Sequence, residues 1–453
     1  MATDDANPDV IIVGAGIAGL AAAWHLRHRR LLILEARPTA GGRVRSELRG
    51  DYWLNFGPHL FPGPDTVLGR LVTSAGLETV GVTGSTLALS FRGTLLTSGR
   101  TWAYPLRLPM SLSARASLAR AGLTIRRGVQ AYAQLGLQRR GETGADVTRR
   151  LLSFEDERSF ADHLGPLHPD ADAILRAAIR RVSAEPEELS AGAGMAQFAA
   201  TFSPSGTSLH HNLPGGTSRL VQVLASSLKD CLRISCQVTA ISQGGGSVEV
   251  QWLEGGATRR STTKHVIVAT PANVARQIIK DLPAGTAEGL SAIRYGPYVV
   301  AAMLTAERSA MPWDDVYAMV TPGRAFNLFF NTASVLRGPG PRRPGGSLMA
   351  YGASDLAWQL IDRSDGQICD AFLHDLAGVY PHLPGLVSEI EIQRWPEGIP
   401  FSSPGRHRWQ RTLEQEHGCV YLAGDYLGAR GGMDTAAVSG HEAACKVLKA
   451  LRP

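Results

Sequence analysis

Three glycines near the amino terminus have the spacing that binding a pyrophosphate requires. Gly14, Gly16 and Gly19 directly follow the apolar run 10–13, in the pattern G-x-G-x-x-G. The first glycine of such a turn permits a tight bend, the second lets the backbone approach a phosphate, and the third lets the next helix pack close to the sheet. The pattern predicts a buried strand followed by a helix over 15–26, whose free N–H groups face the phosphates.

An acidic residue stands where an adenosine ribose would lie. A second apolar run, 31–34, ends on Glu35, which lies 21 residues after Gly14. A carboxylate at that position of a βαβ unit accepts hydrogen bonds from the two ribose hydroxyls. We therefore expect this part of the chain to bind the adenosine and pyrophosphate of a dinucleotide.

Two longer motifs indicate which dinucleotide it is. The run LEARPTAGGRVRS covers residues 34–46, and VYLAGDYLGARGGMDTAAVSGHEAA covers 420–444. Both resemble the flavin-containing amine oxidase and protoporphyrinogen oxidase superfamily, and the chain resembles its protoporphyrinogen-oxidase-like branch more closely. The resemblance implies that the first run closes over an FAD pyrophosphate and that Asp425 meets a ribityl hydroxyl. It also implies a helix that begins at Met433 and stabilises the reduced, anionic flavin with the partial positive charge of its amino end.

The motifs and the resemblance together predict non-covalent FAD, because no cysteine or histidine occupies a motif position that reaches the flavin's 8α carbon. In the family, the turn at 54–61 passes beside the flavin ring. A strand is expected over 232–238, and the family residue that matches its last position, Val238, presents its backbone to adenine. The residues expected to bind FAD on this basis are Gly14, Gly16, Ile17, Ala18, Gly19, Glu35, Ala36, Arg37, Gly42, Arg43, Gly57, Pro58, His59, Val238, Thr270, Gly424, Asp425, Gly432, Met433, Asp434 and Ala436.

Fewer residues are expected to face the substrate. His59 follows the Gly57–Pro58 turn and is the candidate catalytic base, since histidine titrates near neutral pH; a plain hydrogen bond to backbone is an equally weighted alternative. Trp395 and Phe401 are expected to line the pocket. Val300 stands where the amine oxidases of the superfamily carry a lysine near the flavin, and Gly431–Gly432 stands where they carry an aromatic residue.

These departures favour one chemistry over its rivals. The leading hypothesis is an FAD-dependent oxidoreductase, an oxidase or dehydrogenase, that takes hydride from a C–N or C–C bond of a bulky, largely apolar small molecule and passes electrons to O2 or another acceptor. An amine or amino-acid oxidase is the first alternative, for which Arg294, Arg308 or Arg324 would pair with a substrate carboxylate. The second alternative is a non-redox flavoenzyme, because FGPHLF at 56–61 is similar to a turn in UDP-galactopyranose mutases.

The positions of the motifs predict how the chain divides. A chain of 453 residues is too long for one compact core. The expected fold class is α/β, with a Rossmann-type FAD-binding domain of the two-dinucleotide-binding-domain flavoproteins and a discontinuous α+β substrate-binding domain. The FAD-binding domain is expected at 7–85, 213–285 and 405–453, and the substrate-binding domain at 86–212 and 286–404, with a helical region at about 109–200.

Composition argues against several other classes. The net charge of +6 comes from arginines without interleaved aromatic clusters, so no nucleic-acid partner is expected. Five cysteines form no C-x-x-C pair, so a reducing compartment and no metal site are expected. The acidic amino terminus lacks a secretory n-region, which predicts a cytoplasmic location.

The basic amphipathic segment 109–148 fits either peripheral contact with a membrane or, with twice the weight, a helical layer over the active site. No feature of the sequence indicates an oligomeric state.

Overall fold

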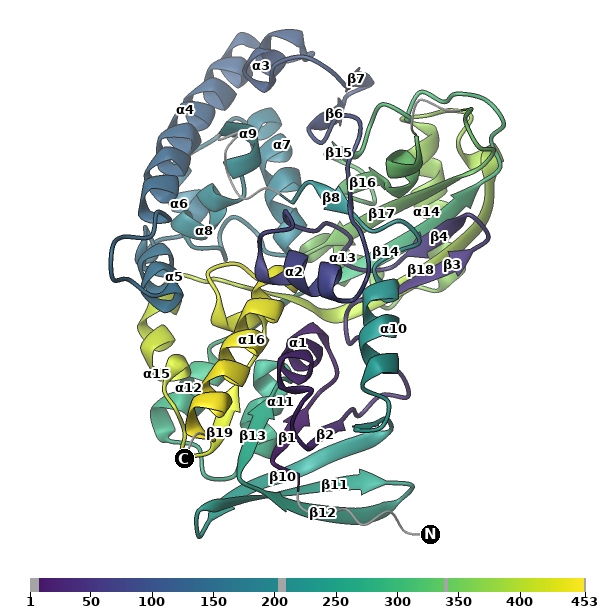
Figure 1. Ribbon diagram of the computed structural model, residues 1–453. Helices are drawn as coiled ribbons and strands as arrows, with labels where there is room; N and C mark the ends of the chain where they lie inside the picture. Colours follow the sequence, from purple (N-terminus) through teal and green to yellow (C-terminus); the bar gives the residue numbers. More distant parts are fainter. Residues whose placement is uncertain (1–7, 203–208, 338–340, 452–453) are drawn as a thin grey trace.

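A computed structural model describes residues 8–202, 209–337 and 341–451 of the chain (Figure 1). Its lower part holds a parallel sheet with helices on it, and its upper part holds a larger mixed sheet on one side and a layer of helices on the other. The predicted α/β fold class is therefore confirmed in outline, with a nucleotide-binding sheet and a separate α+β region.

The nucleotide-binding sheet is parallel, with the strand order β19-β13-β1-β2-β9. Its central strand is fully buried, as expected of an all-apolar run covered on both faces. The sheet brings segments from near the two ends of the chain together, because β13 pairs with β1 on one side and with β19 on the other. The strands are β1 (Val10–Val13), β2 (Leu31–Leu34), β9 (Leu232–Arg233), β13 (His265–Val268) and β19 (Val420–Leu422).

Two helices lie side by side on this sheet, α1 (Ile17–Leu26) and α16 (Met433–Ala450). A Cβ on Gly440 would lie 2.0 Å from the carbonyl oxygen of Ala18, so only glycine permits this approach. The close packing fixes the amino ends of both helices relative to the sheet.

A three-stranded antiparallel meander covers the far end of the parallel sheet. It consists of β10 (Cys236–Gly244), β11 (Ser247–Glu254) and β12 (Ala257–Thr263). The sequence predicted one strand over 232–238 that ends on Val238, and this is wrong. Ser235 has a φ of +54°, which breaks the segment, so Val238 lies inside β10, next to a bulge between Val238 and Ala240.

The substrate-side sheet has seven strands in the order β18-β14-β17-β16-β15-β6-β7. All its pairings are antiparallel except that of β15 with β6. The strands β6 and β7 form a hairpin at one edge of this sheet. The long strand β18 at the other edge contains Trp395. The strands are β6 (Ala88–Phe91), β7 (Thr94–Leu96), β14 (Arg294–Thr305), β15 (Ala318–Val320), β16 (Leu328–Asn331), β17 (Gly346–Ala353) and β18 (Val387–Phe401).

A helical layer occupies much of the predicted region 109–200, on one side of the molecule (Figure 1). Its longest helix, α4, packs Ile125 and Val129 against the other helices of the layer, while Leu112 near its start is 81% exposed. No helix among the described residues is long and apolar enough to cross a membrane. The helices are α3 (Tyr104–Arg107), α4 (Leu112–Leu135), α5 (Gly144–Ser153), α6 (Phe160–Leu164), α7 (Pro169–Ile179), α8 (Ala191–Ala196) and α9 (Ala199–Phe202).

The remaining elements connect these bodies. The hairpin of β3 and β4 lies in the predicted FAD-binding segment 7–85, yet Leu54 and Phe56 pack on Ala302 of the substrate-side sheet. The domain boundaries stay predictions. The connecting elements are β3 (Ser46–Arg49), β4 (Tyr52–Asn55), α2 (Val67–Ser74), β5 (Val80–Gly81), β8 (His211–Asn212), α10 (Ser218–Ser227), α11 (Ala272–Ile278), α12 (Ala284–Ser291), α13 (Asp355–Leu360), α14 (Asp365–Ala377) and α15 (Gln410–Glu414).

Candidate active site

The three glycines of the first turn have three different surroundings. Gly14 has a φ of +98°, and a Cβ there would lie 2.8 Å from the carbonyl oxygen of Ala269. A Cβ on Gly19 would lie 1.9 Å from the carbonyl oxygen of Gly14, so α1 packs on the turn itself. Gly16 differs, because a Cβ there would meet no atom within 4 Å. The first and third glycines therefore serve the fold, and the second borders open space at the amino end of α1, which suits a pyrophosphate.

Glu35 is buried at the end of β2, and backbone groups fix its carboxylate. Its Oε2 accepts a hydrogen bond from the Ala15 N–H at 2.7 Å, and its Oε1 accepts one from the Arg37 N–H at 2.9 Å. The Glu35 carbonyl accepts from the Cys236 N–H at 2.8 Å, which brings the start of β10, and with it Val238, beside this carboxylate. The predicted ribose and adenine positions are thus neighbours in space.

A second arm of the site joins the run 40–46 to the carboxyl-terminal motif. Arg43 forms an ion pair with Asp425, with 2.7 Å between Nη2 and Oδ1, and donates from Nη1 to the Gly398 carbonyl of β18 at 2.9 Å. Asp425 is 4% exposed, and its Oδ2 accepts from the Gly432 N–H at 3.3 Å. In this structure Asp425 therefore binds Arg43, and its predicted contact with a ribityl hydroxyl stays a prediction.

The other residues expected at FAD lie close to the same path. A Cβ on Gly57 would lie 2.5 Å from the Arg43 carbonyl oxygen, so the 57–59 turn runs against the arginine loop. The Thr270 methyl group lies near Gly14, and the Gly424 N–H donates a hydrogen bond to the Ser439 hydroxyl oxygen at 2.9 Å. Because β1, β2, β13 and β19 are parallel, the segments that follow them place Gly14, Glu35, Thr270 and Gly424 at the same edge of the nucleotide-binding sheet.

The amino end of α16 forms an open cradle beside Asp425. Gly432 has a φ of +124°, and a Cβ there would meet no atom within 4 Å. Met433 begins the helix, and the first-turn residue Asp434 has a buried Oδ1 without a hydrogen-bond partner. Burial raises the pKa of Asp434. The open backbone at Gly16 and Gly432, the two free helix ends and this orphaned oxygen fit an extended polar cofactor such as FAD.

An aromatic cluster lies on the substrate-side sheet, beside the turn that precedes His59. Trp395 donates from its indole nitrogen to the Phe56 carbonyl at 2.6 Å, which ties β18 to the turn before His59. Val300 is 3% exposed and lies in the cluster with Trp395. The cluster consists of Val300, Tyr317, Ala318, Leu328, Phe330, Met349 and Trp395, with the partly buried Leu60, Val82, Tyr298 and Tyr351 packed on it. The predicted pocket residues Val300 and Trp395 thus lie together. The sequence did not predict the tyrosines of this cluster, because each of them lies on a different strand or loop.

Phe401 lies at a different part of the cradle. It lines a small cavity with Asp425, Tyr426 and Gly431, and it also belongs to the core of the helical layer. Arg294 lies over its ring at 5.1 Å. Phe401 therefore adjoins the expected flavin edge rather than the aromatic cluster around Trp395.

His59 is buried among aromatic rings. Its ring centroid lies 4.7 Å from that of Phe330 and 5.9 Å from that of Tyr317. Its Nδ1 lies 3.4 Å from the Gly57 carbonyl oxygen, and its Nε2 has no hydrogen-bond partner. Burial lowers the pKa of His59 to about 4. The sequence predicted a base with a pKa near neutrality, and this environment does not provide one. The neutral imidazole instead offers its Nε2 as a hydrogen-bond acceptor.

We expect His59 to make the folded protein sensitive to acid. The pKa of His59 is about 4 in the folded protein and about 6.5 in the unfolded chain. Between pH 6.5 and pH 4 the unfolded chain therefore binds more protons than the folded protein, and the free energy of unfolding falls as the pH falls. The full shift corresponds to about 3 kcal/mol. Urea unfolding of the apoprotein at neutral and acidic pH should show a smaller loss for His59→Gln than for the parent. The exposed His28→Gln is the matched control, and equal losses for the parent and the His59 variant would contradict this assignment.

Arg181 is a charged residue that no motif in the sequence singled out. It follows α7, is partly buried, and its guanidinium has no hydrogen bond or ion pair among the described residues. Burial lowers the pKa of Arg181 to about 10, while the nearby Tyr351 and Tyr298 act in the opposite direction. The Tyr298 hydroxyl donates to the Arg181 carbonyl at 2.7 Å, which holds this residue against the aromatic cluster.

A second arginine adds positive charge at the same place. Arg430, two residues before Gly432, is close enough to Arg181 to lower its pKa. Arg430 is also close enough to Asp434 to lower the pKa of that carboxyl, so Arg181 is the less compensated of the two charges and the one that a bound anion would complete. The arginines expected from the sequence lie elsewhere: Arg294 pairs with Glu188 at 2.5 Å, Arg324 donates to the Asp375 carbonyl at 2.9 Å, and Arg308 is exposed.

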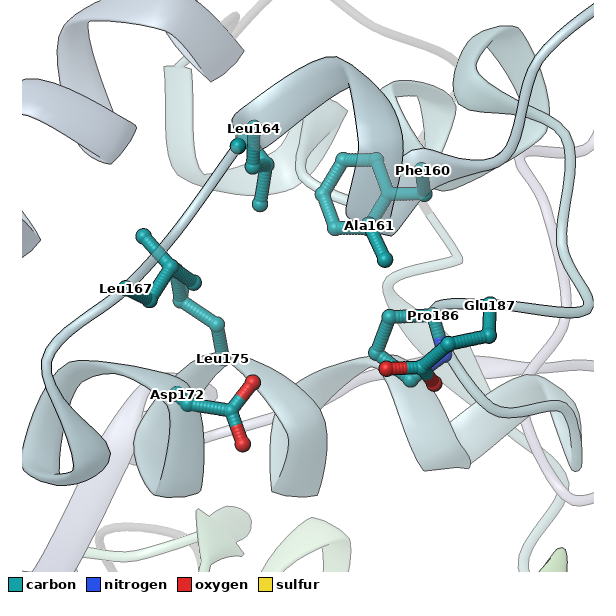
Figure 2. Close-up of a pocket in the computed structure, with 9 residues that line it drawn as sticks. Phe160, Ala161, Leu164, Leu167, Asp172, Leu175, Pro186 and Glu187 are labelled. Carbon is teal, nitrogen blue, oxygen red and sulfur yellow. The ribbon is translucent and has the colours of Figure 1, made fainter.

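A further pocket lies on the helical layer, away from these residues (Figure 2). Phe160 and Leu164 of α6 line one side of it, and Leu175 of α7 faces them from the other. Its two carboxylates, Asp172 and Glu187, are both paired with Arg176. With its acidic groups already neutralised and no predicted site residue on its wall, this pocket has no part in the candidate active site.

Comparison with known proteins identifies the class to which this fold and site belong. The family model of the flavin-containing amine oxidoreductases matches residues 17–448, and the chain belongs to this family. The match and the solved structures below confirm the predicted FAD cofactor. The match also confirms the predicted superfamily.

Curated relatives match over a short segment. An L-amino-acid oxidase of Sistrurus catenatus edwardsii is 38% identical over 79 residues, which is 17% of this chain and 15% of the relative. A coproporphyrinogen III oxidase of Staphylococcus aureus is 35% identical over 81 residues, 17% of each chain. The chain thus spans less than a fifth of the length of these relatives.

Solved structures match over nearly the whole chain. A putrescine oxidase bound to putrescine has a TM-score of 0.76 at 19% identity, covering 98% of this chain and 99% of that one. Cyclohexylamine oxidase from Brevibacterium oxydans IH-35A has a TM-score of 0.78 at 18% identity, with the same coverage. At these identities the likeness shows the fold, including the Rossmann-type FAD-binding part that the sequence predicted.

Proposed function

We propose that the protein is an FAD-dependent oxidoreductase that takes hydride from a C–N or C–C bond of a bulky, largely apolar small molecule. The observation that carries this proposal is the buried aromatic cluster around Val300 and Trp395, which adjoins the Arg43–Asp425 pair through β18. Val300 adds an aliphatic side chain to that cluster, at the position where the amine oxidases that the sequence resembles carry a lysine. Side chains of this kind would favour an apolar substrate face and exclude water.

The residues of the chain would act by positioning. When bound, the flavin supplies the acceptor for the substrate's hydride, and no covalent chemistry is required of the protein. Gly16, Glu35 and the amino end of α1 would hold the adenosine diphosphate half. Arg43 and Asp425 would fix the other half against β18. His59, neutral at physiological pH, would accept a hydrogen bond from a substrate N–H or O–H at Nε2, which orients the bond to be oxidised.

Arg181 supports a narrower substrate class within this proposal. Arg181 is partly buried and has no ion pair among the described residues, and a carboxylate on the substrate would pair with it through a charge-assisted, bidentate hydrogen bond. We therefore infer that the substrate carries a carboxylate next to its apolar body. The protoporphyrinogen-oxidase-like assignment fits such an acidic, bulky molecule.

A second candidate function is an amino-acid oxidase, and Arg181 favours it as well. An amino acid would place its carboxylate on Arg181 and its amine N–H near His59. The amine-oxidase alternative without a carboxylate has less support, because neither Val300 nor Gly432 offers a polar or aromatic contact to a small amine. The mutase-like alternative also has less support, since the family match covers the chain from residue 17 to residue 448.

An anaerobic flavin-reduction screen separates these candidates. Purified holoenzyme is mixed without oxygen with three groups of compounds: polycyclic or porphyrinogen acids, amino acids, and alkyl amines such as benzylamine. Bleaching of the flavin by the bulky acids, with the amines inert, is the expected result. Fast bleaching by amino acids would establish the second candidate, and fast bleaching by benzylamine would contradict both.

A further inference from the structure

A cluster of three metal-ligating side chains lies outside the candidate active site, where α1 crosses α16. His25 comes from the last turn of α1, and His441 and Cys445 come from successive turns of α16. One donor atom of each lies within 4.8 Å of the other two. Residues four apart on a helix share a face, so His441 and Cys445 point together at His25.

The distances within the cluster match those of a tetrahedral zinc site. The Cys445 Sγ lies 3.6 Å from the His25 Nε2 and 3.7 Å from the His441 Nε2. With Zn–S bonds of about 2.3 Å and Zn–N bonds of about 2.0 Å at tetrahedral angles, a sulfur and a nitrogen ligand lie about 3.5 Å apart. A single ion placed among the three atoms therefore reaches all of them with little movement.

Only weak hydrogen bonds hold the three side chains together without a metal ion. The thiol can donate its proton to one Nε2, and the sulfur can accept from the Nε2–H of the other ring, at 3.6 and 3.7 Å. The two imidazole rings also meet edge to face, with centroids 4.4 Å apart, so both Nε2 atoms are turned towards the sulfur. Cys445 is exposed and the two histidines are partly buried, so the site is open to solvent on its sulfur side.

We propose that His25, His441 and Cys445 form a site for Zn2+ in which water or a small external ligand takes the fourth position. As the Zn–S bond forms, the Cys445 S–H bond breaks and its proton passes to the buffer. The bound ion would cross-link α1 to α16, the two helices whose amino ends form the predicted phosphate and flavin cradles. This proposal replaces the expectation of no metal site, and it is independent of the proposed function.

Zinc titration of the FAD-loaded protein tests this site. The protein, freed of metal by a chelator and kept reduced, should bind one equivalent of Zn2+ in competition with a chromogenic chelator. His25→Ala, His441→Ala and Cys445→Ser should each weaken Zn2+ binding by about 100-fold or more, since even the loss of an outer-shell partner costs 10- to 100-fold. Bound zinc should also raise the melting temperature of the parent but not of Cys445→Ser.

Cobalt provides a readout that depends on the ligand set. Co2+ in the parent should give visible d–d bands at wavelengths beyond the flavin absorption, with the intensity of tetrahedral coordination, and these bands should be absent from Cys445→Ser. His28→Ala, an exposed histidine one turn from His25, is the matched control and should keep both the zinc stoichiometry and the cobalt spectrum. Unchanged zinc affinity in the Cys445 and His441 variants, or an octahedral cobalt spectrum in the parent, would overturn the proposal.

Discussion

Gly19→Ala should disrupt the fold and thereby prevent FAD binding. Gly16→Ala should leave the fold intact and weaken only FAD binding. A Cβ on Gly19 would lie 1.9 Å from the Gly14 carbonyl oxygen, a backbone atom that cannot move without disturbing the turn and α1 together. Overpacking of this kind typically costs about 1–3 kcal/mol and more where backbone must shift. A Cβ on Gly16 would meet no protein atom within 4 Å, so the apoprotein has no reason to be destabilised.

The same Cβ at Gly16 would intrude on a pyrophosphate at the amino end of α1. Losing one charge-assisted hydrogen bond there costs about 1.5–3 kcal/mol, which is roughly a 10- to 150-fold weaker FAD complex. Thermal melting of the two apoproteins and FAD titration by fluorescence quenching separate the effects. Gly63→Ala, another glycine with open space around it, is the control. Parent-like FAD affinity in Gly16→Ala would show that the pyrophosphate takes a different path.

Arg181→Met should reduce the affinity of the holoenzyme for aromatic carboxylates such as benzoate by about 10- to 150-fold. The estimate corresponds to a charge-assisted hydrogen bond of about 1.5–3 kcal/mol. Methionine keeps the length and apolar character of the side chain, so the packing beside Phe198, whose ring centroid lies 6.0 Å from the guanidinium carbon, is preserved. The binding is measured from the change in the flavin absorption spectrum.

Matched ligands and variants separate the effect of the Arg181 charge from the effect of its packing. The methyl ester of the same acid should bind the parent and Arg181→Met equally, and Arg181→Lys should recover part of the affinity for the acid because it restores the charge without the bidentate geometry. Arg294→Met, at an exposed arginine paired with Glu188, should behave as the parent. If the acid and its ester lose affinity alike in Arg181→Met, the residue acts through packing and the inferred carboxylate is wrong.

The nucleotide-binding turn could be predicted from the sequence because its determinants are local. Gly14, Gly16, Gly19 and Glu35 lie within one βαβ unit, where strand, turn and helix have fixed lengths and the apolar runs are continuous. The structure places each of them as the motif requires, including the positive φ at Gly14 and the buried Glu35 carboxylate. The family, the fold class and the flavin followed from this unit and from its partner motif near residue 425, and the family match confirms them.

The substrate side depended on pairing between distant strands, which local patterns do not encode. Val238 was misplaced because a single positive-φ serine separates β9 from β10. Trp395 and Val300 were selected by position, but the aromatic cluster around them forms only when β14 pairs with both β17 and β18. The environment of His59 likewise follows from burial against Phe330, and burial is what lowers its pKa.

The residues with the most specific chemistry were visible only after folding. In the sequence, nothing distinguished Arg181 from the other arginines of the helical region 109–200. In the structure, its guanidinium has no hydrogen bond or ion pair among the described residues, and it lies beside Tyr351 and Arg430. His25 and Cys445 are 420 residues apart, and neither belongs to a spacing motif with the other. The sequence by itself determined the local strand, turn and helix structure of its motifs. Long-range packing, here the contact of Gly440 in α16 with α1, decided which distant side chains come into contact.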